Sequence, residues 1–264
     1  MGAVQKSRPP SECCGFTLIE LSVVLVIIGL IVGGVLVGRD LIHAAELRSV
    51  VSQLEQFETA VGAFRLKFNC LPGDCVNADA FGFADAGCTT PYPCPDDNTT
   101  QVQHAGCNGN GNERLDNEPY LAAMCPENLN FWYHLHLAAL IGGSYDGKST
   151  TESTFGPENR TPIYGVSAPA TRLRGVGVLT RLDGYLIGWD DAGHLLSPGA
   201  AQLYTDEAAY IDGKLDDGLP LAGRIQYAIA SNCAVGAGDS IFYNTADRNA
   251  RCAIAMHITG FGSP

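Results

Sequence analysis

The first long apolar segment of the chain covers residues 16–38 and contains a single acidic residue, Glu20. Its length of 23 residues lies within the range of about 17–25 that spans a bilayer as an α-helix. It is too long for the hydrophobic region of a secretory signal, and no small-residue cleavage motif follows it. The pattern therefore predicts a transmembrane helix that the mature protein keeps. A carboxylate at membrane depth costs about 2.5–3.5 kcal/mol, which indicates a functional role for Glu20.

The following segment alternates apolar and polar positions with the period of an α-helix. No proline lies between residues 16 and 69, so one helix is expected over 16–68, ending where Pro72 and Gly73 interrupt CLPGDC. The apolar positions recur every three or four residues and predict one buried stripe: Leu47, Val50, Leu54, Phe57, Val61, Phe64 and Phe68.

Residues 69–264 predict a globular α+β head, in which the amphipathic part of the long helix packs on an antiparallel sheet. A helix is expected over ENLNFWYHLHLAALIGG, capped by Asn128 or Asn130 and ended by Gly142–Gly143. A second is expected to be capped by Thr205 and to end near Asp217–Gly218. Strands are expected in GVGVLTRL and YLIGWD around an Asp183–Gly184 turn, and in HLLS, RIQYAIASN and AIAMHI.

The charge and the cysteines narrow the class of protein. The net charge of −12 argues against nucleic acid as a partner, because nucleic-acid binding needs a basic face. Eight of the ten cysteines follow the apolar segment, which favours disulfides in an oxidising compartment over free buried thiols, the alternative. Cys70 with Cys75 and Cys88 with Cys94 could close short loops, but spacing leaves the connectivity open. Six of the eight lie in a cysteine-rich loop at 69–127, and the other two are Cys233 and Cys252. The six are Cys70, Cys75, Cys88, Cys94, Cys107 and Cys125.

Two polar clusters are candidate Ca²⁺ sites. In CNGNGNERLDNE the side chains of Asn108, Asn110, Asn112 and Asp116 have the oxygen-rich spacing of a calcium loop. The segment is not an EF-hand, since Glu113 stands where the turn glycine belongs, and a polar turn without metal is the alternative.

The second cluster is Asp212, Asp216 and Asp217, at the predicted end of the second helix. Like charges repel there unless they are neutralised. A structural Ca²⁺ could neutralise them, and Arg224 could do so without metal.

Two sequence motifs of enzymes are missing: the chain has no G-x-S-x-G and no H-E-x-x-H. His134 and His136 are two residues apart and would point to different faces of a helix, so they are expected to be surface or core residues.

The segment CCGFTLIELSVVLVIIGLI resembles the signature of type IV prepilins, in which a short leader ends in Gly before Phe-Thr-Leu-Ile-Glu-Leu. The resemblance implies that a prepilin peptidase cuts between Gly15 and Phe16, removes residues 1–15 and methylates the new amino group of Phe16. It also implies that Glu20 pairs with the terminal ammonium of a neighbouring subunit during assembly, because two charges that are each costly in apolar surroundings offset one another. Polar partners in an ordinary membrane bundle are the alternative for Glu20.

Cys233 and Cys252 resemble the cysteines that close the C-terminal disulfide loop of many type IV pilins, here 233–252. The resemblance implies a structural subunit of a type IV pilus-like filament, formed with identical or homologous subunits by an inner-membrane assembly machinery. A single-pass inner-membrane precursor would then become a surface filament or a periplasmic pseudopilus. Alternatives are a type II secretion pseudopilin, a minor or tip pilin with an adhesive role, and a membrane-anchored enzyme.

Overall fold

The computed structural model describes residues 17–83, 108–109, 111–115, 127–147, 165–166, 168–173, 176–181, 184–188, 202–237, 240–247 and 249–258. The chain divides into two compact units, Met1–Ala45 and Glu46–Pro264. The elements agree with the predicted α+β class, with a long N-terminal helix and antiparallel sheets.

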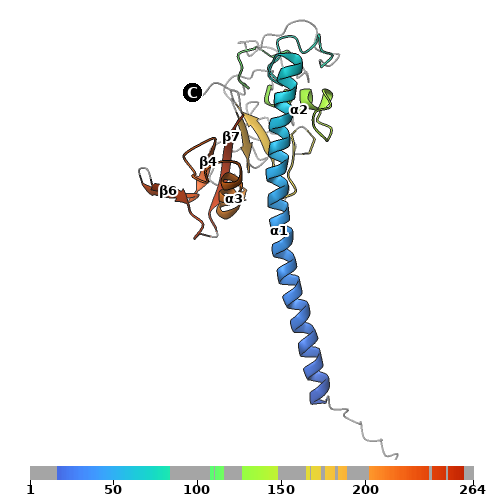
Figure 1. Cartoon of the computed structure of the whole chain (residues 1–264), viewed down its shortest axis with the longest axis vertical. Helices are drawn as coiled ribbons and strands as arrows, with labels where there is room; N and C mark the ends of the chain where they lie inside the picture. Colours follow the sequence, from blue (N-terminus) through green and yellow to red (C-terminus); the bar gives the residue numbers. More distant parts are fainter. Residues whose placement is uncertain are drawn as a thin grey trace, which may run out of the picture. The chain divides into compact units, whose positions relative to one another are not determined.

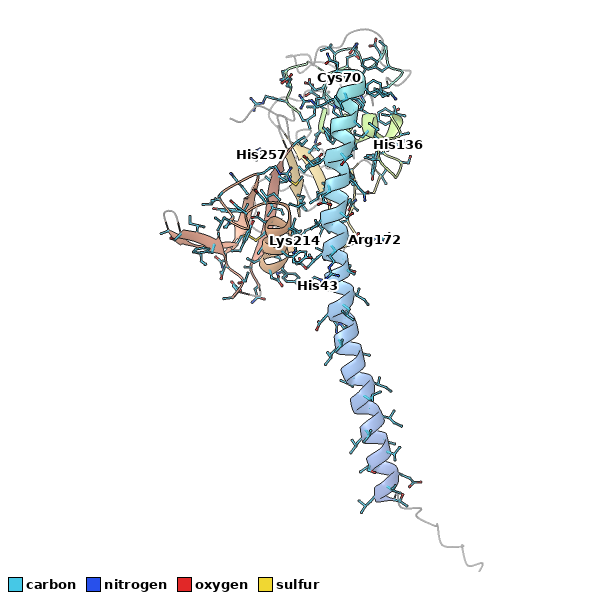
Figure 2. All side chains as sticks on the ribbon, viewed as in Figure 1. His43, Cys70, His136, Arg172, Lys214 and His257 are labelled. Carbon is cyan, nitrogen blue, oxygen red and sulfur yellow. A yellow bond between two sulfur atoms is a disulfide. The ribbon has the colours of Figure 1, made fainter. Side chains whose placement is uncertain are left out.

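In the first unit, α1 (Leu18–Phe68) presents apolar side chains on every face. The large apolar side chains from Leu18 to Ile42 are exposed, ranging from 46% at Val24 to 89% at Leu18. Within the described residues, α1 is the helix that is long and apolar enough to cross a membrane. Figure 2 shows the side chains of its blue, N-terminal part directed to both sides of the ribbon.

In the second unit, the rest of α1 carries the predicted buried stripe. Buried positions recur with the spacing of one helix face, and Phe68 at the end of the stripe is half-buried. The helix ends at Phe68 as expected, because Asn69 turns into the left-handed region with a φ of 54°. The buried positions are Leu47, Val50, Leu54, Phe57, Ala60, Val61 and Phe64.

The stripe packs on an aromatic core that α2 (Glu127–Leu137) helps to build. The ring of Phe57 meets Trp132 edge-on at 4.8 Å between centroids, and Phe64 lies 5.7 Å from Phe83. His134 is fully buried and stacks on Phe83 at 5.2 Å. Burial of several large rings at one place stabilises the packing of this part of α1.

The main sheet is centred on β7 (Arg251–His257), which has partners along both edges. One edge pairs with β4 (Ile225–Ser231), and the other pairs with β2 (Gly184–Ile187) and then β3 (Leu203–Tyr204). β1 (Val178–Arg181) pairs with β2, which confirms the hairpin expected at Asp183–Gly184. All these pairs are antiparallel, and Figure 1 shows β4 and β7 side by side with α3 near them. A side chain at Gly184 would stand 2.6 Å from the Met256 carbonyl oxygen, so this strand position needs glycine.

Two further elements complete the described head. α3 (Thr205–Leu215) follows β3 directly, and β5 (Ala234–Ala237) forms a two-stranded hairpin with β6 (Ser240–Tyr243). The strands β3, β5 and β6 were not predicted, and the predicted strand HLLS lies outside the described residues.

The predicted ends of the two short helices were wrong by a few residues. α2 begins at Glu127, so Asn128 and Asn130 lie inside the helix and do not cap it. It stops before Gly142 because Ala139 adopts a φ of 57°, and because the N–H of Leu140 donates to the Leu135 carbonyl at 3.0 Å. α3 is capped at Tyr204, whose N–H donates to the Glu207 carboxylate at 2.8 Å, and not at Thr205.

Candidate functional site

The first turn of α1 is closed by a reciprocal pair of side chains, Thr17 and Glu20. The backbone N–H and the hydroxyl of Thr17 both donate to Oε2 of Glu20, at 2.9 and 2.7 Å. The N–H of Glu20 in turn reaches the Thr17 hydroxyl at 3.3 Å. This is a capping box, which satisfies N–H groups that the start of a helix leaves without partners. Within one subunit, Glu20 therefore has a local role, which the spacing T-x-x-E contained and the sequence analysis missed.

The helix that follows this box needs an apolar environment. Leu25, Val26 and Ile27 are each more than half exposed, and as consecutive residues they lie on different faces of α1. A soluble monomer seldom exposes a continuous apolar surface of this extent. Lipid or the apolar helices of other subunits would cover it.

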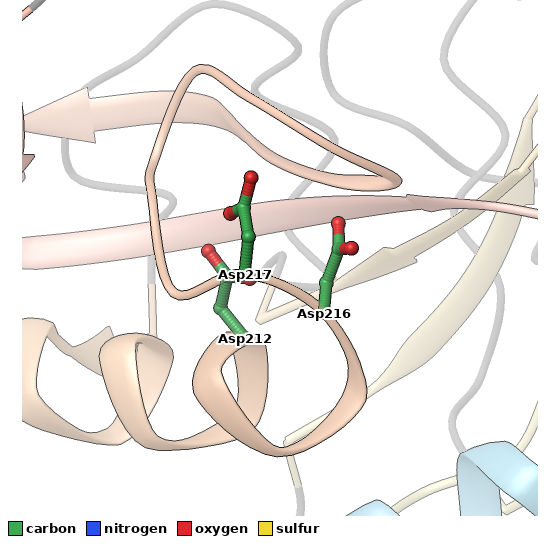
Figure 3. A group of neighbouring side chains, drawn as sticks. All are labelled: Asp212, Asp216 and Asp217. Carbon is green, nitrogen blue, oxygen red and sulfur yellow. The ribbon is translucent and has the colours of Figure 1, made fainter.

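The three aspartates predicted to cluster do come together at the C-terminal end of α3. Asp212, Asp216 and Asp217 each offer a carboxylate oxygen, and these atoms lie within 4.8 Å of one another. Figure 3 shows the three carboxylates around the last turn of α3 and the loop that follows it. Separations of this size suit a common cation with oxygen ligands at about 2.3–2.6 Å.

Each of these carboxylates also accepts hydrogen bonds within the head. Asp212 is fully buried and accepts from the Tyr243 hydroxyl at 2.8 Å and from the N–H of Gly218 at 3.1 Å. Burial raises the pKa of Asp212, and the hydrogen bond from Tyr243 opposes part of that effect. Asp217 accepts from the N–H of Leu219 at 2.8 Å. The cluster thus holds the end of α3 against the β6 hairpin.

Arg224 meets this cluster through its backbone and not through its charge. Its N–H and that of Ile225 donate to Asp216, while its guanidinium forms an ion pair with Glu58 of α1 at 3.2 Å. The alternative in which the Arg224 side chain neutralises the aspartates does not match this contact.

Burial, with the nearby Glu58 carboxylate as a second cause, raises the pKa of Tyr185 on β2 well above its ordinary value.

The asparagine-rich segment is CNGNGNERLDNE, residues 107–118. The part of it that the structure describes is not arranged as a calcium loop. The side-chain oxygens of Asn108 and Asn112 accept from the N–H groups of Asp79 and Arg114, at 3.0 and 2.9 Å. Asn110 and Asp116 lie outside the described residues.

The N–H groups of this segment point at a carboxylate that the sequence analysis did not select. Asp74 is buried, and its two oxygens accept from Gly111 at 2.6 Å and Glu113 at 2.7 Å. Here the segment donates to an anion, which is the opposite of holding a cation. Calcium binding by the asparagine-rich segment stays a prediction.

The two histidines take structural positions, as predicted. His134 accepts from the N–H of Gly73 through Nδ1 at 2.9 Å, and His136 meets the ring of Tyr145 edge-on. Figure 2 places His136 on α2.

Comparison with known proteins finds the prokaryotic N-terminal methylation motif at residues 11–36. The match includes the capping box and most of the exposed apolar segment of α1. The chain carries the type IV pilin/pseudopilin signature. No match to the chain was found among curated proteins or among solved structures.

The signature supports a pilin-like precursor that a prepilin peptidase processes, and a structural subunit in place of an enzyme. The cleavage residues Gly15 and Phe16 lie outside the described residues, which begin at Thr17. Cleavage and methylation at these two residues stay a prediction.

The head that follows the signature contains two disulfides among its described cysteines, Cys70–Cys75 and Cys233–Cys252. The first closes the short loop expected around Pro72 and lies at the C-terminal end of α1 (Figure 2). The second links the segment before β5 to β7, and so joins the hairpin to the central strand. The remaining cysteines of the head, Cys88, Cys94, Cys107 and Cys125, lie outside the described residues.

Proposed function

We propose that the chain is a structural subunit of a type IV pilus-like extracellular filament, assembled through the apolar part of α1. The observation that carries the proposal is the coincidence of the methylation motif at residues 11–36 with a helix segment exposed on every face. A helix of this kind is stable in the inner membrane before assembly, and among the helices of other subunits afterwards. Head-to-tail contacts between identical subunits that do not close into a ring extend into a filament.

In this proposal a prepilin peptidase removes residues 1–15 and methylates Phe16. The new terminal ammonium then lies close to Glu20 of the same or a neighbouring subunit. An ammonium from the neighbour offsets the desolvation of the Glu20 carboxylate, and only one axial stagger brings the two charges together. Glu20 would thus cap its own helix in the precursor and also set the register in the filament.

Fibres sheared from cells test the proposal directly. Mass spectrometry of the fibre protein should identify this chain with N-methyl-Phe16 as its first residue. Fibres that lack the chain, or that contain it with residues 1–15 attached, would contradict the proposal. Short fibres confined to the periplasm would support the pseudopilin alternative.

We also propose that Asp212, Asp216 and Asp217 bind a structural Ca²⁺. The support is the closeness of three carboxylates, one of them fully buried. A ligand present at 100 times its Kd stabilises the folded state by about 2.7 kcal/mol.

Removing calcium with a chelator should therefore lower the Tm of the purified chain, and the Asp217→Asn variant should lose this response. Asp206→Asn, on the first turn of the same helix and outside the cluster, should keep it. An unchanged Tm in the chelator would remove the metal from the proposal and leave the aspartates as hydrogen-bond acceptors.

A further inference from the structure

The two described disulfides differ in how far a reductant can reach them. Cys233 and Cys252 are both fully buried. In the other pair Cys75 is fully buried, but Cys70 is half-buried. Cys70 also lines a cleft of about 300 Å³, together with Arg65, Asp74 and Glu113.

The loop closed by Cys70–Cys75 holds three parts of the head together. Gly73 donates its N–H to His134 of α2 at 2.9 Å. Asp74 accepts from Gly111 and Glu113, and the N–H of Gly109 donates to the Cys75 carbonyl at 2.8 Å. The C-terminal end of α1, α2 and the asparagine-rich segment therefore meet at this loop.

The contacts at Gly73 leave little freedom to rearrange while the loop is closed. Gly73 has a φ of 87°, and a side chain at this position would overlap the backbone of α2 at Glu127. A side chain at Gly109 would overlap the backbone of Asp74 in the same way. Such close backbone approaches depend on the loop keeping one conformation.

We propose that Cys70–Cys75 is a redox switch: it is reduced by dithiols while Cys233–Cys252 stays intact, and its reduction releases the loop from α2 and from the asparagine-rich segment. A thiolate of the dithiol attacks Sγ of Cys70 through the cleft, and the sulfur of Cys75 leaves as a thiolate. The second thiol of the reductant then attacks the mixed disulfide and releases Cys70. The dithiol ends as a disulfide, and its two protons end on the two cysteines.

Accessibility favours reduction of this bond first. Attack requires access to one sulfur along the S–S axis, and exposed disulfides are the labile ones. The bond also closes a sequence separation of 5, compared with 19 for Cys233–Cys252, so its loss lowers the stability of the fold less and leaves the rest of the head folded. The inference uses the disulfides of the head and does not depend on the filament proposal.

A dithiothreitol titration of the full chain in detergent micelles tests the switch. After each step, free thiols are alkylated and located by mass spectrometry. Cys70 and Cys75 should become alkylated at a dithiothreitol concentration at least tenfold lower than Cys233 and Cys252. Equal sensitivity of the two pairs, or reduction of Cys233–Cys252 first, would overturn the proposal.

Hydrogen exchange on the partly reduced protein tests the structural consequence. Peptides that contain Gly73, Gly111 and Glu113 should lose protection, while peptides from β7 keep it. The variant with Cys70→Ser and Cys75→Ser should show the same local loss without reductant, and Cys233→Ser with Cys252→Ser serves as the matched control pair. Unchanged protection around Gly73 after reduction would show that the bond is not a switch.

Discussion

One α-helix contains two segments with opposite requirements, and their comparison explains the design of the chain. Between residues 18 and 42 the large apolar side chains of α1 are exposed on every face. Between residues 47 and 64 the apolar side chains fall on one face, and the head buries that face completely. The backbone conformation is the same in both segments, and no proline separates them.

The difference shows that the hydrophobic pattern, and not the helix itself, decides what each segment contacts. An apolar stripe about one face wide is satisfied by a single packing surface, here the sheet and α2. A helix that is apolar on all faces needs an environment that surrounds it. The first segment is therefore left for lipid or other subunits, and the second is committed to its own head.

The largest difference should appear when the same substitution is made in the buried stripe and on an exposed face. Leu54 is fully buried and Leu66 is 91% exposed on the same part of α1. Leu54→Ala should lower the free energy of unfolding of the head by about 2–5 kcal/mol, because it leaves a cavity. Leu66→Ala should change it by less than about 0.5 kcal/mol. Urea denaturation of the purified, detergent-solubilised chain measures both, and equal effects would contradict the comparison.

A charge placed in the first segment should affect membrane insertion and leave the head folded. Leu30→Arg places a cation at the middle of the exposed apolar segment, which costs about 2.5–3.5 kcal/mol on insertion. The fraction of chain that resists carbonate extraction from membranes should fall accordingly. Leu66→Arg, which places the same charge on an exposed face of the second segment, is the control and should insert normally. An equal loss with both variants would show that the two segments are not distinct.

The smallest predicted effect is a change in how the stability of the head depends on pH. It comes from Tyr185, whose buried phenol lies against the second segment of α1. Tyr185 contacts Phe57 of α1, with 6.3 Å between ring centroids. Burial raises the pKa of Tyr185 well above its ordinary value near 10 in the folded head, so the folded state holds this proton more tightly than the unfolded chain does. The stability that the protonated Tyr185 side chain gives the folded head is fully present below the pKa that Tyr185 has in the unfolded chain. This stability is lost as the pH rises above about 10, at up to about 1.4 kcal/mol per pH unit.

Tyr185→Phe should therefore flatten the loss of Tm between pH 9.5 and 11 relative to wild type. Tyr210→Phe, a partly buried tyrosine on α3, is the control and should follow the wild-type curve. A Tyr185→Phe curve that coincides with wild type would show that this phenol does not titrate with unfolding.

Features that depend on local spacing could be predicted from the sequence, and features that depend on distant contacts could not. The buried stripe of α1 and the strands β4 and β7 follow from periodicity, which a short segment contains in full. The end of α2 was misjudged because Ala139 takes the left-handed conformation that glycine usually signals.

The same reason explains what was missed in the functional residues. The role of Asp74 rests on N–H groups 37 and 39 residues away, and the Glu58–Arg224 pair joins residues 166 apart. The fold brings these residues together, so no local sequence motif predicts the contacts. Thr17 with Glu20 is the opposite case, since the capping box was visible in four consecutive residues.

The measurement that tests the central claim most directly is the yield of fibres from two variants of the capping box. Thr17→Ala removes the cap at a cost of about 1 kcal/mol and keeps the carboxylate. Glu20→Ala removes both the carboxylate and its part of the capping box. We predict that both variants enter the membrane like wild type, that Thr17→Ala assembles into sheared fibres near the wild-type amount, and that Glu20→Ala falls at least tenfold. Fibres of Glu20→Ala at the wild-type amount, or an equal loss with Thr17→Ala, would contradict a role for the Glu20 charge in assembly.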